Sequence, residues 1–201
     1  MSVPNLPTYQ AQKFAYRMEN LLKQRRRWDE QPELGFLYLH EKGGIHAEAL
    51  AIPSPLWKGD PKNLLRSLVH VLTSPSDTVP GMIGDTLRNV PPDLVGLYLR
   101  TEGWAPPEEQ MPEIHRRRQA GASVPRFETL AGRVETRMMT AVDTMGRLYM
   151  TTQCRTDGLV RPCAWEGMHA TATTPGYEVD GNIPSLLLQL VMGLKARPAR
   201  T

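Results

Sequence analysis

The chain has 201 residues, of which 40% are hydrophobic and 22% charged, and its formal net charge is +3. This length and balance are typical of one globular domain and exclude a low-complexity chain. Cys154 and Cys163 are the only cysteines, which excludes a disulfide-rich secreted domain. The first thirty residues contain no apolar signal segment, and no run approaches the ~18 apolar residues of a membrane span. We therefore expect a cytoplasmic protein with no membrane partner.

The N-terminal part predicts a helix followed by a hairpin. Apolar residues recur at helical spacing across residues 8–28, and three arginines near the end of this stretch would offset the helix dipole. Residues 34–40 and 45–52 are two predicted strands joined by a short turn with two glycines. Small alanines alternate along one side of the second strand, so we expect a helix to lie close to it.

The middle of the chain predicts a capped helix and a long strand. Asp60 and Pro61 have the residue types of a helix cap and first helical position, and an apolar stripe follows them. A short helix is expected over residues 82–88. Residues 94–104 alternate between apolar and polar side chains, which predicts a strand covered on one side. Its apolar side is expected to carry Val95, Leu97 and Leu99.

The C-terminal half begins with a polar excursion over residues 105–130, which is rich in proline and contains a predicted helix at 113–120. A second hairpin is expected from residues 134–142 and 147–154, with a glycine in its turn. The last helix is predicted over residues 184–195 and has a continuous apolar stripe.

These elements predict an α+β fold in which an antiparallel sheet of about five strands is built from hairpins and the helices pack on one face. Residues 1–195 would form a single domain, and the basic tail 196–201 would be disordered. The opposite face of the sheet would then be open.

That open face is the predicted binding surface. It would present imidazole, carboxylate, guanidinium and aromatic groups, which suit a recognition surface or an acid–base site. The alternative is a solvated sheet face on which arginine and glutamate side chains pair across strands. The residues predicted to share it are Tyr98, Arg100, Glu102, Trp104, His46 and Glu48.

The tripeptide His46-Ala47-Glu48 matches the His-x-Glu part of zinc nucleobase deaminases, whose other ligands come from Pro-Cys-x-x-Cys. Pro162 and Cys163 begin such a motif, but its second cysteine is missing. The simpler interpretation is an exposed histidine and glutamate on a strand. The sequence therefore predicts no metal site, no cofactor and no catalytic residue.

Two basic clusters offer a nucleic-acid interpretation, in which arginines hold phosphates and a tryptophan stacks on a base. The alternative is helix-terminal charge exposed to solvent. The residues concerned are Arg25, Arg26, Arg27 and Trp28 in the first cluster and Arg116, Arg117 and Arg118 in the second.

Two segments of the chain form a recognisable pattern. The first is residues 94–104, which end in Glu102-Gly103-Trp104, and the second is the hairpin from Val134 to Arg147 with its Asp-x-x-Gly turn. This pattern resembles an uncharacterised group of proteins from actinobacteria and their phages. The resemblance implies a bacterial or phage-encoded cytoplasmic protein, but it implies no activity and no site residue.

The leading hypothesis is a non-enzymatic protein that binds another macromolecule, either a protein partner or a second copy of itself. Exposed tryptophan, tyrosine and arginine are the types enriched at interface hot spots. Two alternatives remain open. One is a small hydrolase-type or deaminase-like enzyme that uses the open sheet face, and the other is a weak nucleic-acid binder.

Overall fold

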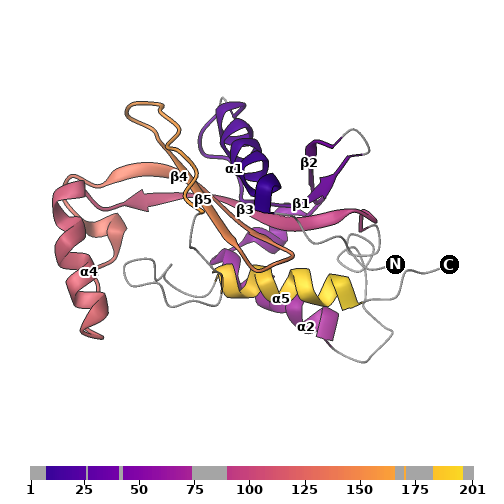
Figure 1. The fold of residues 1–201 in the computed structure, drawn as a ribbon. Helices are drawn as coiled ribbons and strands as arrows, with labels where there is room; N and C mark the ends of the chain where they lie inside the picture. The colour runs from indigo at the N-terminus through magenta and orange to yellow at the C-terminus, as the bar shows by residue number, and fades with distance from the viewer. Residues whose placement is uncertain are drawn as a thin grey trace.

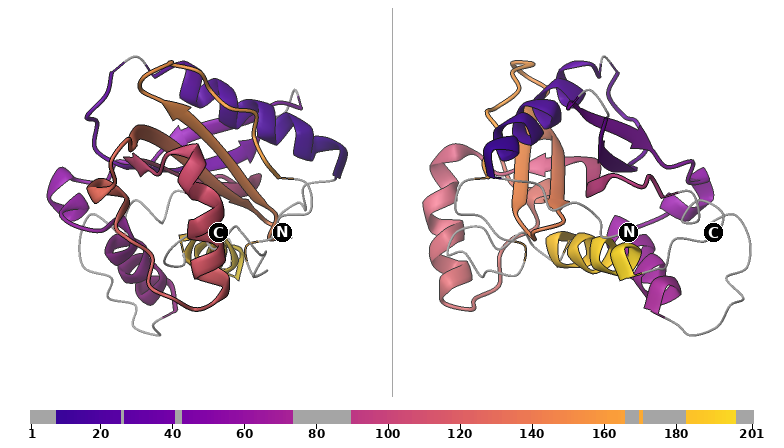
Figure 2. Two further views of the ribbon diagram at one scale, coloured as in Figure 1. Left: turned by 90° about the vertical axis from the view of Figure 1, so that its left-hand side faces the viewer. Right: turned by 45° about the vertical axis from the view of Figure 1, so that its right-hand side comes forward.

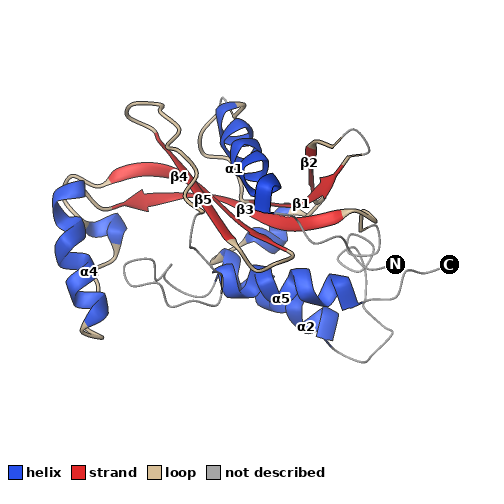
Figure 3. Ribbon diagram, in the orientation of Figure 1, coloured by secondary structure: helices blue, strands red, loops and turns tan. Residues whose placement is uncertain are grey.

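The computed structural model describes residues 8–25, 27–40, 43–73, 90–165, 170 and 183–196. Helices lie on both sides of a central sheet, which Figure 3 shows in red. In chain order the elements are α1 (Thr8–Lys23), β1 (Glu33–Leu39), β2 (Ile45–Ala49), η1 (Ser54–Trp57), α2 (Pro61–Thr73), β3 (Leu94–Ala105), η2 (Glu108–Gln110), α4 (Met111–Gln119), η3 (Phe127–Thr129), β4 (Val134–Asp143), β5 (Leu148–Cys154) and α5 (Ile183–Ala196).

The sheet has five antiparallel strands in the order β2-β1-β3-β4-β5 (Figure 1). Both predicted hairpins are present, as β1–β2 and β4–β5. The long strand β3 joins them by pairing with β1 on one side and β4 on the other. The predicted α+β class with a five-stranded antiparallel sheet is therefore confirmed.

Helices α2 and α5 pack against each other and cover one face of the sheet (Figure 1). The predicted cap of α2 is confirmed, because the Lys62 amide donates to Asp60 Oδ1 at 3.0 Å. Between the helices and the sheet lies an apolar core. Its most deeply buried members include Leu65, Leu94, Leu97, Val142, Leu187, Leu190 and Val191.

Helix α1 lies on the other face, so the expectation that helices pack on one face needs correction. The rings of Phe14 and Tyr149 approach to 4.2 Å between centroids. A side chain at Gly96 would lie 3.0 Å from the Phe14 ring, so this glycine allows α1 to lie close to the sheet. Ala47 on β2 also packs into this core, as the row of small residues predicts.

A β-bulge changes the predicted alternation of β3. The register with β1 shifts between Leu37 and Tyr38, which leaves an extra residue on β3. Val95 consequently packs into the α1 core, whereas Leu97 and Leu99 pack into the α2–α5 core. The prediction that Val95 shares a face with these two leucines is wrong for this reason.

Two predicted elements end earlier than expected. Helix α1 ends at Lys23 rather than at residue 28, because the following segment turns and crosses the sheet. Strand β2 ends at Ala49, and the chain turns there with the Ile52 amide donating to the Leu50 carbonyl at 2.8 Å. The predicted helix at 82–88 and the tail after residue 196 lie outside the described residues.

The polar excursion forms an arm (residues 106–133) at the outer end of β3 and β4. Figure 2 shows its helix α4 standing apart from α1, α2 and α5. Ile114 of this helix is buried. Among the described residues, no helix combines the length and apolar character needed to cross a membrane.

The two edges of the sheet differ. The β5 edge is covered by a return segment (residues 155–165), because Met150 and Ala164 exchange both backbone hydrogen bonds and the Arg161 amide donates to the Thr152 carbonyl. The β2 edge has no such cover: in the described part of the chain, β2 forms backbone ladder bonds with β1 alone.

Candidate functional site

The segment that follows α1 crosses the sheet over the outer parts of β3 and β4, and we call its described residues, 24–25 and 27–32, the crossing segment. Its placement is set by polar bonds. The Asp29 amide donates to Glu102 Oε2 at 2.7 Å, and the carbonyl of Gln31 accepts from Arg100 at 3.4 Å. The cluster of charged side chains at this segment contains three of the residues singled out from the sequence, Arg25, Arg100 and Glu102.

Arg137 on β4 is the centre of this cluster and is completely buried. Its guanidinium donates from Nε to Glu102 Oε1 at 2.7 Å and also to the backbone carbonyls of Arg25 and Arg27. The Trp28 ring lies over it, with 4.6 Å from the guanidinium carbon to the ring centroid. One arginine of the sheet therefore holds the crossing segment in place.

Arg100 on β3 is the second buried arginine, with 3% of its surface exposed. It donates to Glu30 Oε2 at 3.0 Å and lies 3.6 Å from Glu33. Glu33 also bonds Arg25 and accepts from the Tyr98 hydroxyl at 2.9 Å. Burial, followed by the charge of Glu33, raises the pKa of Tyr98 well above its ordinary value.

Tyr98 lies across β1 because residue 35 is a glycine. A side chain there would come within 2.3 Å of the tyrosine ring and 2.6 Å of the Glu48 carbonyl oxygen. Tyr98 and Arg100 are therefore covered by the chain itself, and the prediction that they belong to an open face is wrong. The physical reason is that α1 and the crossing segment occupy that face.

The cluster is close to electrically balanced. Three of its carboxylates, from Asp29, Glu102 and Glu135, have oxygen atoms within 4.8 Å of one another. Arg155 bonds Asp29 and Glu135, and Arg137 bonds Glu102, so guanidinium groups already neutralise these oxygens. The full cluster consists of four arginines and five carboxylates. The arginines are Arg25, Arg100, Arg137 and Arg155, and the carboxylates belong to Asp29, Glu30, Glu33, Glu102 and Glu135. Cross-strand pairing of arginine with glutamate is thus present, and it is buried at Arg137 and Glu102 but partly exposed at Arg155 and Glu135.

His46 and Glu48 lie away from this cluster. The register pairs Ala49 with Gly35 and Gly35 with Tyr98, so the odd-numbered residues of β2 share the face of Tyr98. His46 and Glu48 therefore point to the opposite face and lie two strands away from β3. His46 and Glu48 were predicted to share the open face with Glu102, and this register shows that they do not.

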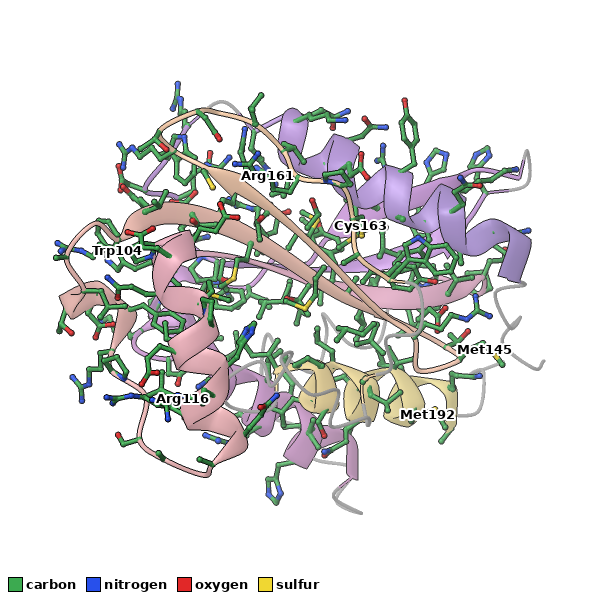
Figure 4. All side chains as sticks on the ribbon, turned by 60° about the vertical axis from the view of Figure 1, so that its left-hand side comes forward. Trp104, Arg116, Met145, Arg161, Cys163 and Met192 are labelled. Carbon is green, nitrogen blue, oxygen red and sulfur yellow. The ribbon has the colours of Figure 1, made fainter. Side chains whose placement is uncertain are left out.

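Of the four predicted site residues on β3, Trp104 is the one that remains exposed, at 39%. It lies opposite Glu135 in the β3–β4 ladder, at the point where the arm begins. The guanidinium carbon of Arg133 lies 4.6 Å from its ring centroid. Figure 4 shows Trp104 at this outer end of the sheet, far from Met145 at the other end.

Several side chains of the two predicted basic clusters already have partners within the chain. Trp28 has two guanidinium groups over its ring, from Arg137 and Arg155. In α4, Glu113 bonds both Arg116 and Arg117, and Arg117 and then Arg116 lower the pKa of Glu113. Of the remaining predicted residues, Arg25 pairs with Glu33, and Arg27 has an exposed side chain and contributes its backbone carbonyl to the bond with Arg137. Arg26 and the side chain of Arg118 lie outside the described part.

Sequence reasoning missed Arg133 beside Trp104 and six members of the charged cluster, which are Asp29, Glu30, Glu33, Glu135, Arg137 and Arg155. A signal for one pair was present, because Arg137 and Glu102 face each other once the β3–β4 register is known. Comparisons with protein-family models, with curated proteins and with solved structures give no match to this chain.

Proposed function

We propose that this chain functions by binding another protein, and that the partner docks on the surface formed by Trp104 and Arg133 at the root of the arm. We call this the Trp104–Arg133 surface. The observation that carries the proposal is a tryptophan that remains 39% exposed while a guanidinium stacks on its ring.

The chemistry of these two side chains supports a protein partner. Tryptophan and arginine are among the residues most enriched at interface hot spots. Among the described residues, no carboxylate forms an ion pair with Arg133, so its charge is available to a partner. The surface suits a segment that presents an apolar side chain beside an aspartate or glutamate.

The rigidity of the surrounding strands also supports binding here. Trp104 and Glu135 form one pair of a continuous β3–β4 ladder, and the buried Glu102–Arg137 pair lies two residues along. A side chain held on paired strands loses little freedom when a partner docks, which favours affinity.

Charge favours a protein over a nucleic acid. Arg25, Arg116 and Arg117 are all paired with carboxylates of the chain itself. A phosphate backbone would have to displace these carboxylates, which lowers the gain from counterion release.

The test is a comparison of three purified proteins: wild type, Trp104→Ala and Tyr16→Ala. Tyr16 on α1 is 63% exposed and gives a matched control for loss of a surface aromatic. Proteins captured from a lysate of the expressing cell are quantified by mass spectrometry, and the partner is then titrated by calorimetry. We expect Trp104→Ala to weaken binding by ~30-fold or more, as for a hot-spot residue, and Tyr16→Ala to leave it unchanged.

Arg133→Glu provides the second arm of the test. Reversing this charge should weaken binding of an acidic segment further than removing it by Arg133→Ala. A partner that binds wild type and Trp104→Ala equally well would contradict the proposal, provided that circular dichroism shows both proteins folded.

A further inference from the structure

The exposed edge of β2 carries a second, independent inference about the molecule. We propose that two copies of this chain pair antiparallel through β2, around a two-fold axis at Ala47, to form one continuous ten-stranded sheet. This surface lies at the other edge of the sheet order from β4 and β5, and it does not involve Trp104 or Arg133.

The pattern of hydrogen bonds shows which groups of β2 are available. The His40 amide donates to the Gly44 carbonyl, and the Leu50 amide donates to the Leu34 carbonyl. Hydrogen-bonded pairs alternate along an antiparallel ladder, so the even-numbered residues of β2 bond to β1. The odd-numbered residues Ile45, Ala47 and Ala49 consequently direct their amides and carbonyls away from the sheet.

A second copy satisfies all of these groups in one register. With the axis at Ala47, each Ala47 bonds its equivalent, and Ile45 of one copy bonds Ala49 of the other. Each of these three pairs exchanges two backbone hydrogen bonds. The interface is isologous, as in most homodimers, because the same five residues are used by both copies.

Side-chain charge selects this register over its neighbours. With the axis at Ala47, His46 faces Glu48 of the second copy twice, and an imidazole N–H can donate to each carboxylate. An axis moved by one residue would place His46 opposite His46 or Glu48 opposite Glu48. Only the register with its axis at Ala47 places an imidazole opposite a carboxylate at both His46 and Glu48. This register also gives the longest overlap of the two strands.

The side chains of this edge are already held on one face. The His40 ring stacks on the His46 ring with 4.5 Å between centroids, and the Tyr38 ring lies 5.9 Å from it. Ala47 and Ala49 on the other face are small, so they leave room for the strand of a second copy.

The test is the mass in solution as a function of protein concentration, measured by sedimentation. Wild type is expected to show a monomer–dimer equilibrium. Glu48→Lys should raise the dissociation constant at least about tenfold, because both His46 imidazoles lose the carboxylate that accepts their N–H. The double variant His46→Glu/Glu48→Lys restores both pairs and should return the constant to within about threefold of wild type. Glu109→Lys, on the exposed η2 turn of the arm, is the control with the same charge change.

Ala47→Pro removes the central amide, which points away from β1, so the monomer should keep its fold while the dimer is lost. A wild-type protein that stays monomeric at every concentration overturns the proposal. So does a dimer that Glu48→Lys and Ala47→Pro leave intact, since it would use another surface. If a monomer captured a foreign protein and lost it on Ala47→Pro, the edge would serve a strand of that protein instead. Trp104→Ala should not change the dimer, which keeps this outcome separate from the proposed function.

Discussion

The two faces of the sheet are built from alternate residues of the same strands, but different forces stabilise them. The face under α2 and α5 is a continuous apolar core. The face under α1 is apolar only near Phe14 and Tyr149, and beyond them it buries Arg100 and Arg137 under the crossing segment. The comparison shows that a polar side of a strand can be as deeply buried as an apolar one, provided that each charge has a partner.

The largest effect is expected from removal of Arg137, the buried charge at the centre of the face under α1. Arg137→Ala leaves Glu102 without its main partner and two backbone carbonyls without a donor, so we expect a loss of about 3–5 kcal/mol in the free energy of unfolding. Urea denaturation measures it. The control is Arg155→Ala, which removes the other cation over Trp28 but from a position that is 43% exposed.

Arg155→Ala should lower the free energy of unfolding by no more than about 1 kcal/mol. Adding Glu102→Ala to Arg137→Ala should recover part of the loss, because no unpaired buried charge then remains. If Arg137→Ala were no more harmful than Arg155→Ala, the crossing segment would not depend on the buried arginine.

The apolar face is tested by Leu190→Ala in α5, where the side chain is 1% exposed. The free energy of unfolding should fall by about 3 kcal/mol, because the variant removes buried methyl groups and leaves a cavity. Met192→Ala in the same helix is the control, since Met192 is 52% exposed and should change stability little. Thermal unfolding measures both, and equal losses would mean that α5 does not pack as described.

The smallest effect concerns Cys163, which lies beside α1 (Figure 4). Burial, and then the charge of Glu19, raises the pKa of its thiol to about 12. In a Cys154→Ser background, disulfide-exchange labelling of the folded protein at pH 8 should be at least ~100-fold slower than in urea, because so little thiolate is present. The rate should keep rising with pH instead of levelling off near pH 9.

The dependence of folding stability on pH gives a second measurement of the Cys163 thiol. The folded state holds the thiol proton more tightly than the unfolded state, so its contribution to stability is full below pH ~8.5 and is lost as the pH rises towards 12. Cys163→Ala should remove this part of the loss of stability at alkaline pH. Rapid labelling of the native thiol at pH 8 would contradict the described burial.

Features that depend on residues close together in the chain could be predicted from the sequence. The Asp60 cap, the two hairpins and the small-residue side of β2 follow from short-range patterns, and all three are present. The burial of Tyr98 and Arg100 has a distant cause, because the segment that covers them precedes them by about seventy residues and resembles the end of a helix. Alternation predicts which residues share a side of a strand, but not what lies over that side.

The separation of His46 from Glu102 has a similar explanation. Assigning their faces requires the register of β2 on β1 and of β1 on β3, and turn residues alone do not fix the second of these. Trp104 was predicted to be exposed and is exposed, because it lies beyond the reach of the crossing segment.

The covered edge of β5 has a consequence for assembly size. Strands that add to both edges of a sheet build filaments, whereas this chain has already used its β5 edge to bond residues 155–165. A dimer formed through β2 would therefore have, at each end of its sheet, a β5 edge that residues 155–165 already cover, which disfavours addition of a third molecule there.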